Sequence, residues 1–206
     1  MEEEWLKVFD DTRRQIGVAT RKEVHEKGLW HETFHCWIVS EEEVPVIYLQ
    51  IRSPRKKDYP NLLDITAAGH LLSTENVKDG VREMEEEIGI NVTIEDLTYL
   101  GILHYEMING TLLDKEFAHT YLYKKTINEE AFLLQEEEVA GIVSATIDDF
   151  YALWNGTKET IEVRGFEVND KGEREEIQRV VDKADFAPHP LSYYVILIEL
   201  LQENIS

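Results

Sequence analysis

The pattern of apolar and polar positions predicts a helix with two distinct faces over residues 76–88. Its apolar residues recur at intervals of four, three and four positions, which places them along one side of an α-helix. These residues are Val77, Val81, Met84 and Ile88. Glu86 and Glu87 follow Glu83 by three and four positions, so the three carboxylates share a different side. Like charges at that spacing repel, so a purely structural helix gains nothing from them.

Alternating and β-branched residues predict a series of strands before this helix. The expected elements are a hairpin of residues 5–9 and 15–19, a short helix or turn at 21–26, paired strands at 31–39 and 44–51, and a strand at 62–67. The hairpin is expected to cover an edge of the sheet. In the strand at 31–39, alternation places His31, Thr33 and His35 on one face and Phe34 and Cys36 on the other.

After the helix, the pattern predicts two more hairpins and two more helices. They are a hairpin of residues 97–107 and 112–123, a strand at 142–146, a helix at 147–154, a hairpin of 160–168 and 175–181, and a helix from about 190 to 203. The dipeptide Asn109-Gly110 strongly favours a tight turn in the first hairpin. This mixture of elements is typical of an α/β protein with a mixed sheet between helical layers.

Composition and charge narrow the class of protein. The 206 residues are 43% hydrophobic, enough for one core, and no linker divides them. We expect one domain over residues 1–206, with a C-terminal extension from about 151 to 206. No apolar run approaches a membrane span and the first residues lack the pattern of a signal peptide, so we expect a cytoplasmic protein. The single Cys36 cannot form an internal disulfide and is expected to be packed.

A net charge of −21 sets conditions on any ligand. It repels nucleic acid polymers and anionic membranes, so neither is an expected partner. A phosphate-bearing ligand would need a local cationic patch or a metal ion. The carboxylates of Glu83, Glu86 and Glu87 suit Mg²⁺ or Mn²⁺, although a solvated acidic face is the alternative in a chain this rich in glutamate.

The residues around these glutamates resemble the Nudix box, G-x5-E-x7-R-E-U-x-E-E-x-G-U, where U is a bulky aliphatic residue. The matching positions are Gly69, Glu75, Arg82, Glu83, Met84, Glu86, Glu87, Gly89 and Ile90. One departure is that six residues, rather than seven, separate Glu75 from Arg82. The resemblance implies a Nudix-type α/β/α sandwich with a mixed sheet, a Mg²⁺- or Mn²⁺-dependent hydrolase, catalytic metal ligands at Glu83, Glu86 and Glu87, and an ion pair through which Arg82 braces the acidic loop.

Residues 1–150 are similar to the isopentenyl-diphosphate isomerases, which are members of the same superfamily. This similarity implies a possible second metal site, or a polar pocket for substrate, at His25, His31, His70, Asp114 and Glu116. It also implies diphosphate contacts from Arg52 and Lys56. The position of the isomerases' catalytic cysteine is Ala68 here, and a methyl group cannot exchange a proton.

The favoured function is therefore a hydrolase of a small diphosphate, a nucleoside diphosphate linked to another group. An isomerase-like protein and a non-catalytic ligand-binding domain are the alternatives, and a homodimer is a further possibility. The general base is left open between Glu83 and a residue of the run at 136–138, namely Glu136, Glu137 or Glu138. Trp30, Trp37 and Tyr59 could stack on a base, but core packing is favoured for each. His119 and His189 are expected to have structural roles.

Overall fold

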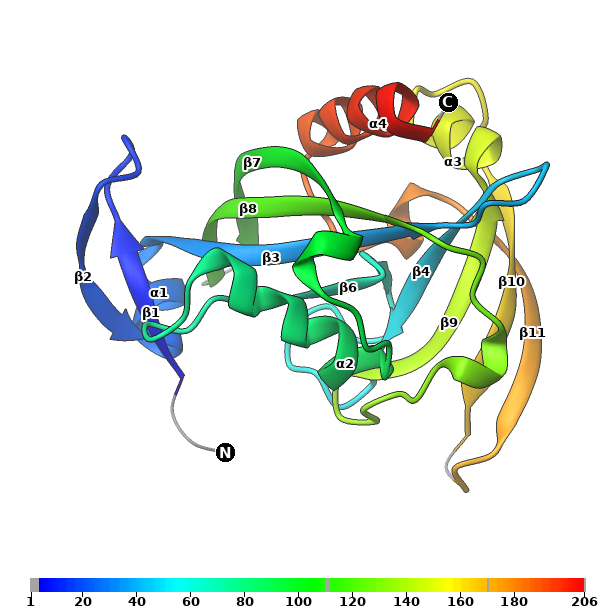
Figure 1. Ribbon diagram of the computed structural model, residues 1–206, viewed down its shortest axis with the longest axis horizontal. Coiled ribbons are helices and arrows are strands. Elements are labelled where there is room, and N and C mark those ends of the chain that lie inside the picture. The colour runs from blue at the N-terminus through cyan, green and yellow to red at the C-terminus, as the bar shows by residue number, and fades with distance from the viewer. Residues whose placement is uncertain (1–3, 110–111, 170, 206) are drawn as a thin grey trace.

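The computed structural model describes residues 4–109, 112–169 and 171–205, in which the strands form one mixed sheet (Figure 1). The strands are β1 (Trp5–Phe9), β2 (Gln15–Thr20), β3 (Trp30–Val39), β4 (Val46–Arg52), β5 (Leu63–Asp64), β6 (Ala67–His70), β7 (Thr98–Asn109), β8 (Leu112–Lys124), β9 (Val139–Thr146), β10 (Ile161–Val168) and β11 (Arg174–Val181). The helices are α1 (Arg21–Lys27), α2 (Arg82–Ile88), α3 (Ile147–Trp154) and α4 (Leu191–Ile205), with 3-10 helices η1 (Val77–Val81), η2 (Ile94–Asp96), η3 (Glu129–Ala131) and η4 (Lys183–Asp185).

The centre of the sheet divides into two branches. β3 and β4 pair at Ile38 with Tyr48 and at Val39 with Ile47. Further along, β4 pairs with β5, whereas β3 pairs with β6 on this side and runs parallel to β8 on its other side. The hydroxyl of Thr66 lies at the division, where it accepts a hydrogen bond from the Ile38 N–H at 3.1 Å and donates one to the Tyr48 carbonyl. The division leaves an opening in the sheet between β5 and β6.

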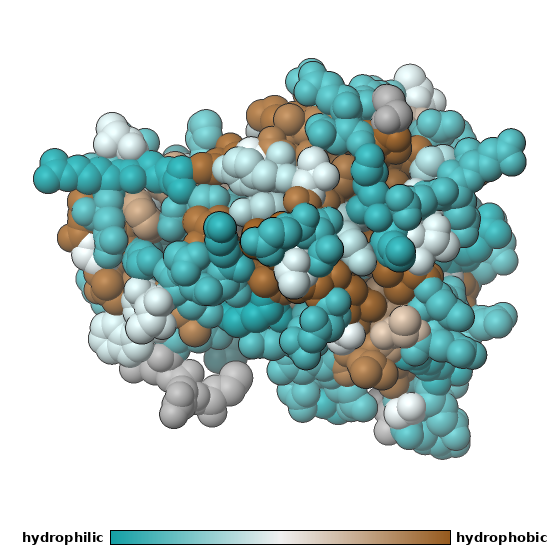
Figure 2. Space-filling model, in the orientation of Figure 1, coloured by the Kyte–Doolittle hydropathy of each residue, from teal (hydrophilic) through white to brown (hydrophobic). Residues whose placement is uncertain are grey.

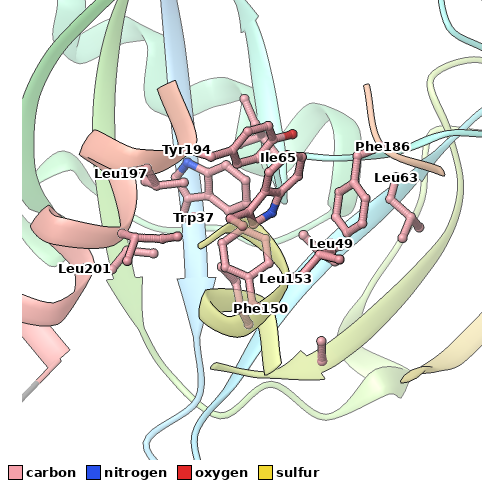
Figure 3. Close-up of a cluster of buried hydrophobic side chains, with 14 of the residues drawn as sticks. Trp37, Leu49, Leu63, Ile65, Phe150, Leu153, Phe186, Tyr194, Leu197 and Leu201 are labelled. Atoms are coloured by element: carbon pink, nitrogen blue, oxygen red, sulfur yellow. The ribbon is translucent and has the colours of Figure 1, made fainter. Parts of the chain in front are cut away.

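Alternation along β3 supplies a hydrophobic core on each face of the sheet. Trp37 and Val39 pack with α3 and α4 on one face, in the cluster shown in Figure 3. Phe34, Cys36 and Ile38 pack with α2 on the other face. The layers are therefore helix, sheet and helix, as Figure 1 shows. Cys36 is fully buried, and burial raises the pKa of its thiol, so it is packed as expected.

Most of the observed helices and strands agree with those predicted from the sequence. The hairpin of β1 and β2 continues the sheet from β3 and so covers an edge, and α1, α3, α4 and the pairs β7–β8 and β10–β11 lie where the pattern predicts them. The predicted turn at residues 109–110 reaches outside the described residues. The face in Figure 2 is mainly hydrophilic with smaller apolar patches. Across the described ranges, no helix is both long and apolar enough to cross a membrane.

Two predictions about the elements were wrong in detail. Residues 76–88 are not one α-helix, because the 3-10 helix η1 precedes α2. Gly80 of η1 packs so closely on β3 that a Cβ there would approach Phe34 Cβ to 2.7 Å. Residues 62–67 are not one strand, because β5 ends at Asp64, whose own carboxylate accepts from the Ile65 N–H at 2.9 Å.

Candidate active site

A cleft of about 620 Å³ opens where the sheet divides. Its walls come from β5 and β6, from α1 and α2, from the loop after β4, and from the chain just before α4. Carboxyl groups outnumber arginine and lysine side chains in this lining by more than two to one. An anionic ligand would therefore be repelled unless a cation is bound with it.

The carboxylates of α2 reach the cleft beside strand β6. Glu83 and Glu87 are 8% and 4% exposed. A Cβ on Gly69 would lie 2.1 Å from Glu83 Oε1, so this close approach requires glycine. Glu87 Oε2 accepts a hydrogen bond from the Ala68 N–H at 3.0 Å and lies 3.5 Å from the Gln50 amide nitrogen. Two successive residues of β6 thus position two carboxylates one helical turn apart.

Arg82 connects the remaining acids of the predicted box. Its guanidinium lies 2.5 Å from Glu75 Oε1, 2.7 Å from Glu83 Oε1 and 2.7 Å from Glu86 Oε2. Glu75 also accepts a hydrogen bond from the Leu72 N–H at 2.8 Å, so it orders the loop between β6 and η1. Glu86 is 53% exposed at its side chain and turns toward Arg82. All three predicted metal ligands line the cleft, but they do not gather at a single point.

The buried glutamates hold their protons more strongly than usual. Burial raises the pKa of Glu83 to about 8, with help from the charge of Glu87 and against the opposing charge of Arg82. Burial likewise raises the pKa of Glu87 to about 7, although Lys56 and the Ala68 N–H oppose it. A divalent cation favours the charged carboxylates and offsets this cost. The oxygen-only donor set therefore fits Mg²⁺ or Mn²⁺.

The five residues of the predicted second site also come together. One ligand atom from each of His25, His31 and His70 lies within 4.8 Å of the others, and the same holds for His31, Asp114 and Glu116. Nδ1 of His25 is 2.8 Å from the Arg21 carbonyl, and Nδ1 of His31 is 3.1 Å from the Leu29 carbonyl. Because a carbonyl accepts only, each Nδ1 carries a proton, and in the neutral ring each Nε2 keeps a lone pair. Against the effect of burial, Asp114 raises the pKa of His25.

The Nε2 atoms of His25 and His31 both face a further acceptor, Asp114 Oδ1. His31 Nε2 and Asp114 Oδ1 are 3.6 Å apart, buried, and without a hydrogen-bond partner among the described residues. Burial lowers the pKa of His31, and lowers that of His70 well below its usual value, so both rings are neutral as metal ligands must be. A cation bound by both acceptors would remove the unfavourable contact, so these residues fit a divalent metal ion.

Glu116 is held by a network that sequence analysis did not identify. Its Oε2 accepts from the hydroxyls of Thr33 at 2.8 Å and Tyr105 at 2.7 Å, and lies 3.2 Å from His35 Nε2. Burial would raise the pKa of Glu116, but His35 outweighs it and the pKa is well below its usual value. His35 Nδ1 lies 2.9 Å from the Tyr193 hydroxyl. The strand alternation that put His35 beside His31 was the available signal.

The predicted phosphate contacts both line the cleft. Arg52 Nη1 lies 2.7 Å from Asp64 Oδ2, and its Nη2 donates to the Asp58 carbonyl at 2.8 Å. Lys56 forms an ion pair with Glu138. Both cationic side chains predicted to bind phosphate, Arg52 and Lys56, therefore have a carboxylate partner. The partner fixes the position of each side chain and reduces the net charge there.

Other predicted residues divide between the cleft and its surroundings. Glu138 lines the cleft, whereas Glu136 and Glu137 are exposed partners of Arg55 outside the lining. Among the aromatic residues, Tyr59 lines the cleft, Trp37 is buried in the core and Trp30 stacks on Phe117 with ring centroids 4.6 Å apart. His119 lies away from the cleft beside Glu32, at 3.1 Å. His189 does line the cleft, although the sequence pattern did not predict that it would.

Comparison with known proteins identifies the family of this chain. The family model of the NUDIX domain matches residues 29–163 of this chain. An uncharacterised Nudix hydrolase of Clostridium acetobutylicum is 40% identical over 205 residues, which cover 99% of this chain and 100% of that protein. An isopentenyl-diphosphate Delta-isomerase of Aliivibrio fischeri is 31% identical over 144 residues, covering 68% of this chain and 78% of the isomerase.

A solved structure supports the fold. The crystal structure of a MutT/nudix family protein from Enterococcus faecalis matches with a TM-score of 0.52 at 14% identity, covering 84% of this chain and 61% of that protein. The domain match spans more than half of the chain, and the relative from Clostridium acetobutylicum is similar over its full length. The chain therefore belongs to the Nudix hydrolase family.

Proposed function

We propose that the protein is a Mg²⁺- or Mn²⁺-dependent hydrolase that cleaves the diphosphate of a nucleoside diphosphate linked to another group. The observation that carries this proposal is the pair of buried glutamates, Glu83 and Glu87, at the wall of a cleft that also presents Arg52 and Lys56. Their pKa values, raised by burial, support the proposal, because bound cations would stabilise the charged carboxylates. A cleft of about 620 Å³ is large enough for a ligand of this class.

Each residue has a role that follows from its contacts. Metal bound by Glu83, Glu86 and Glu87 would supply the positive charge that a diphosphate needs in this acidic cleft. Arg52 would donate its free N–H groups to phosphate oxygens, and Lys56 would add a point charge. Arg82 holds three acids of the box in place. These residues bind and orient the diphosphate, which is most of what phosphoryl transfer requires.

Glu83 is the preferred general base among the four candidates. Glu136 and Glu137 lie outside the cleft lining, and Glu138 is engaged with Lys56. Glu83 lines the cleft and is one of the predicted metal ligands, so its carboxylate would lie beside a metal-bound water. We therefore infer that Glu83 accepts the proton of the attacking water.

An isomerase-like reaction on an isoprenoid diphosphate is the second candidate. The histidine cluster and the hydrogen bond from Tyr105 to Glu116 favour it, as does the similarity to an isomerase. Ala68 opposes it, because this residue pairs with His35 across β3 and β6 and offers a methyl group to the cleft. Moving a double bond requires a group that exchanges protons at that position, so hydrolysis is the better-supported reaction.

The test is to incubate the full-length protein with Mg²⁺ and a panel of nucleoside diphosphate derivatives together with isopentenyl diphosphate. We expect release of a nucleoside monophosphate or inorganic phosphate, abolished in Glu87→Gln. Glu85→Gln is the matched control, because Glu85 is an exposed residue of the same helix and does not line the cleft. Full turnover by Glu87→Gln would refute the metal site, and double-bond migration without cleavage would show that the protein is an isomerase.

A further inference from the structure

The chain beyond the matched NUDIX region returns to the cleft. Residues 29–163 carry the match, yet the segment between η4 and α4 lies against β5. Phe186 forms a parallel bridge with Leu63, and the Ala187 N–H donates to the Leu63 carbonyl at 2.8 Å. This contact places His189 next to Asp64, the residue after Leu63. A C-terminal histidine thereby becomes part of the cleft wall.

Asp64 connects this histidine to a predicted phosphate-binding residue. His189 Nε2 lies 2.9 Å from Asp64 Oδ1, and Arg52 Nη1 lies 2.7 Å from Asp64 Oδ2. The side chains of His189 and Asp64 are each 7% exposed, and that of Arg52 is 14% exposed. With a donor on each oxygen, the carboxylate cannot rotate without breaking a buried hydrogen bond.

The surroundings of His189 also fix its tautomer and its plane. Its Nδ1 is buried and has no hydrogen-bond partner in the part of the chain that the structure describes. A proton there would be unsatisfied, so the neutral ring carries its proton on Nε2 and donates it to Asp64. The ring stacks on Tyr193 at 5.0 Å and meets Tyr105 edge-on at 5.4 Å. His189 is thus held as a directed donor.

Arg52 retains donors for an anion in this arrangement. Of the five guanidinium N–H groups, one on Nη1 goes to Asp64, one on Nη2 to the Asp58 carbonyl, and that of Nε to the carbonyls of Asp58 and Tyr59. The second N–H on each terminal nitrogen has no such bond among the described residues. Their direction depends on the guanidinium plane, which Asp64 fixes.

We propose that His189 is a positioning residue which, through Asp64, orients the free N–H groups of Arg52 toward the diphosphate of the substrate. This proposal rests on the proposed function, in which Arg52 binds that diphosphate. It gives the C-terminal extension a part in substrate binding, in addition to its packing against the core. A second buried histidine, His119, serves as the control that separates an effect on substrate binding from an effect on packing.

His119 forms the same kind of triad away from the cleft. Its Nε2 lies 3.1 Å from Glu32 Oε1, which Arg13 Nη2 approaches at 2.8 Å. None of these three residues lines the cleft. His119 is 3% exposed, so its replacement removes a buried histidine that contacts a carboxylate and an arginine, without touching the site. It is therefore the matched control for His189.

The experiment titrates methylenediphosphonate, a diphosphate analogue that resists hydrolysis, into the full-length protein with Mg²⁺ and follows binding by calorimetry. We expect His189→Phe to raise Kd about tenfold, the cost of misdirecting hydrogen bonds from a charged group. His189→Gln, whose amide can replace the Nε2 donor, should recover most of the affinity. His119→Phe should leave Kd unchanged. His189→Asn, whose shorter amide does not reach Asp64, is a second test if the Phe variant does not fold.

A double-mutant cycle tests the route through Arg52. In an Arg52→Met background, His189→Phe should have no further effect on Kd, because the residue on which it acts is gone. Additive effects, an unchanged Kd in both His189→Phe and His189→Asn, or equal losses in His189→Phe and His119→Phe would each overturn the proposal. An unchanged Kd in Arg52→Met alone would instead refute the phosphate role of Arg52 in the proposed function, and the positioning role with it.

Discussion

At the scale of single residues, the position of the Glu83 carboxylate depends on the absence of a side chain at Gly69. Its absent Cβ leaves the space in which the Glu83 carboxylate lies, 2.1 Å from where that atom would be. The box pattern identifies Gly69 by its position, but the reason for glycine is visible only when α2 and β6 are placed together. Its φ angle is not in the left-handed region, so close approach alone explains it.

Gly69→Ala should therefore reduce kcat/KM about 100-fold, because the carboxylate must move by roughly an ångström. We also expect a loss of about 1–3 kcal/mol of stability from overpacking, measured by chemical denaturation. Gly17→Ala is the control, because a Cβ at Gly17 meets nothing within 4 Å. Equal activity in the two variants would mean that the position of Glu83 does not matter for turnover.

The histidine cluster gives a second prediction at this scale, on metal content. After chelation and reloading with Mn²⁺, we expect His31→Gln to hold about one fewer ion per chain than the wild type by elemental analysis, because it loses a neutral imidazole ligand. His119→Gln removes an equally buried histidine outside the cluster and should keep the full content. An unchanged content in His31→Gln would mean that the cluster is a polar pocket.

At the scale of elements, the sequence predicted the faces of the acidic helix but not its winding. The stripe of Val77, Val81, Met84 and Ile88 does face the core on the α2 side of the sheet. Periodicity alone does not predict the 3-10 winding of η1, in which Gly80 packs closely against Phe34 of β3. A 3-10 helix rises about 2.0 Å per residue against about 1.5 Å in an α-helix. The five residues of η1 therefore advance further than five α-helical residues would, which offsets the missing residue between Glu75 and Arg82.

The buried acids of α2 predict how stability depends on pH without divalent metal. Burial raises the pKa of Glu83 to about 8 and that of Glu87 to about 7, so the folded state keeps protons that the unfolded chain has released. The free energy of unfolding should therefore fall as pH rises from about 4.5 to about 8. Mg²⁺ should raise the melting temperature more at pH 8 than at pH 6, because protons compete with the metal at the lower pH.

Variants of the same helix assign that dependence. Glu83→Gln should flatten the fall in stability between these pH values and weaken the effect of Mg²⁺, both followed by thermal melting. Glu85→Gln should change neither, because Glu85 is exposed. A fall in stability that is identical in both variants would place its origin in the general negative charge of the chain.

At the scale of the whole molecule, strand pairing determines which residues meet. The parallel register of β3 and β8 sets His31 opposite Glu116, and the return of the C-terminal segment sets His189 beside Asp64. The sequence predicted the strands and, through resemblance, the cluster around His31. It could not predict the site of His189, because that requires the order of strands at the division of the sheet. Local patterns therefore predicted elements well and long-range contacts poorly.

The charge of the whole chain makes a final prediction, on the effect of salt. A net charge of −21 and an acidic cleft repel an anionic substrate over distances that depend on ionic strength. The screening length falls from about 30 Å at 0.01 M salt to about 8 Å at 0.15 M. With Mg²⁺ saturating, kcat/KM should rise over this range, as measured by initial rates at low substrate concentration.

Neutralising exposed acids far from the site should reproduce part of this effect at low salt. Residues 41–43 are three consecutive exposed glutamates outside the cleft lining, so their joint replacement by glutamine lowers the repulsion without touching the site. We expect kcat/KM of that variant to be higher than the wild type at 0.01 M salt and equal to it at 0.15 M. A rate that falls as salt increases would mean that Arg52, Lys56 and bound metal dominate the field at the cleft, and that substrate is attracted from a distance in spite of the overall charge.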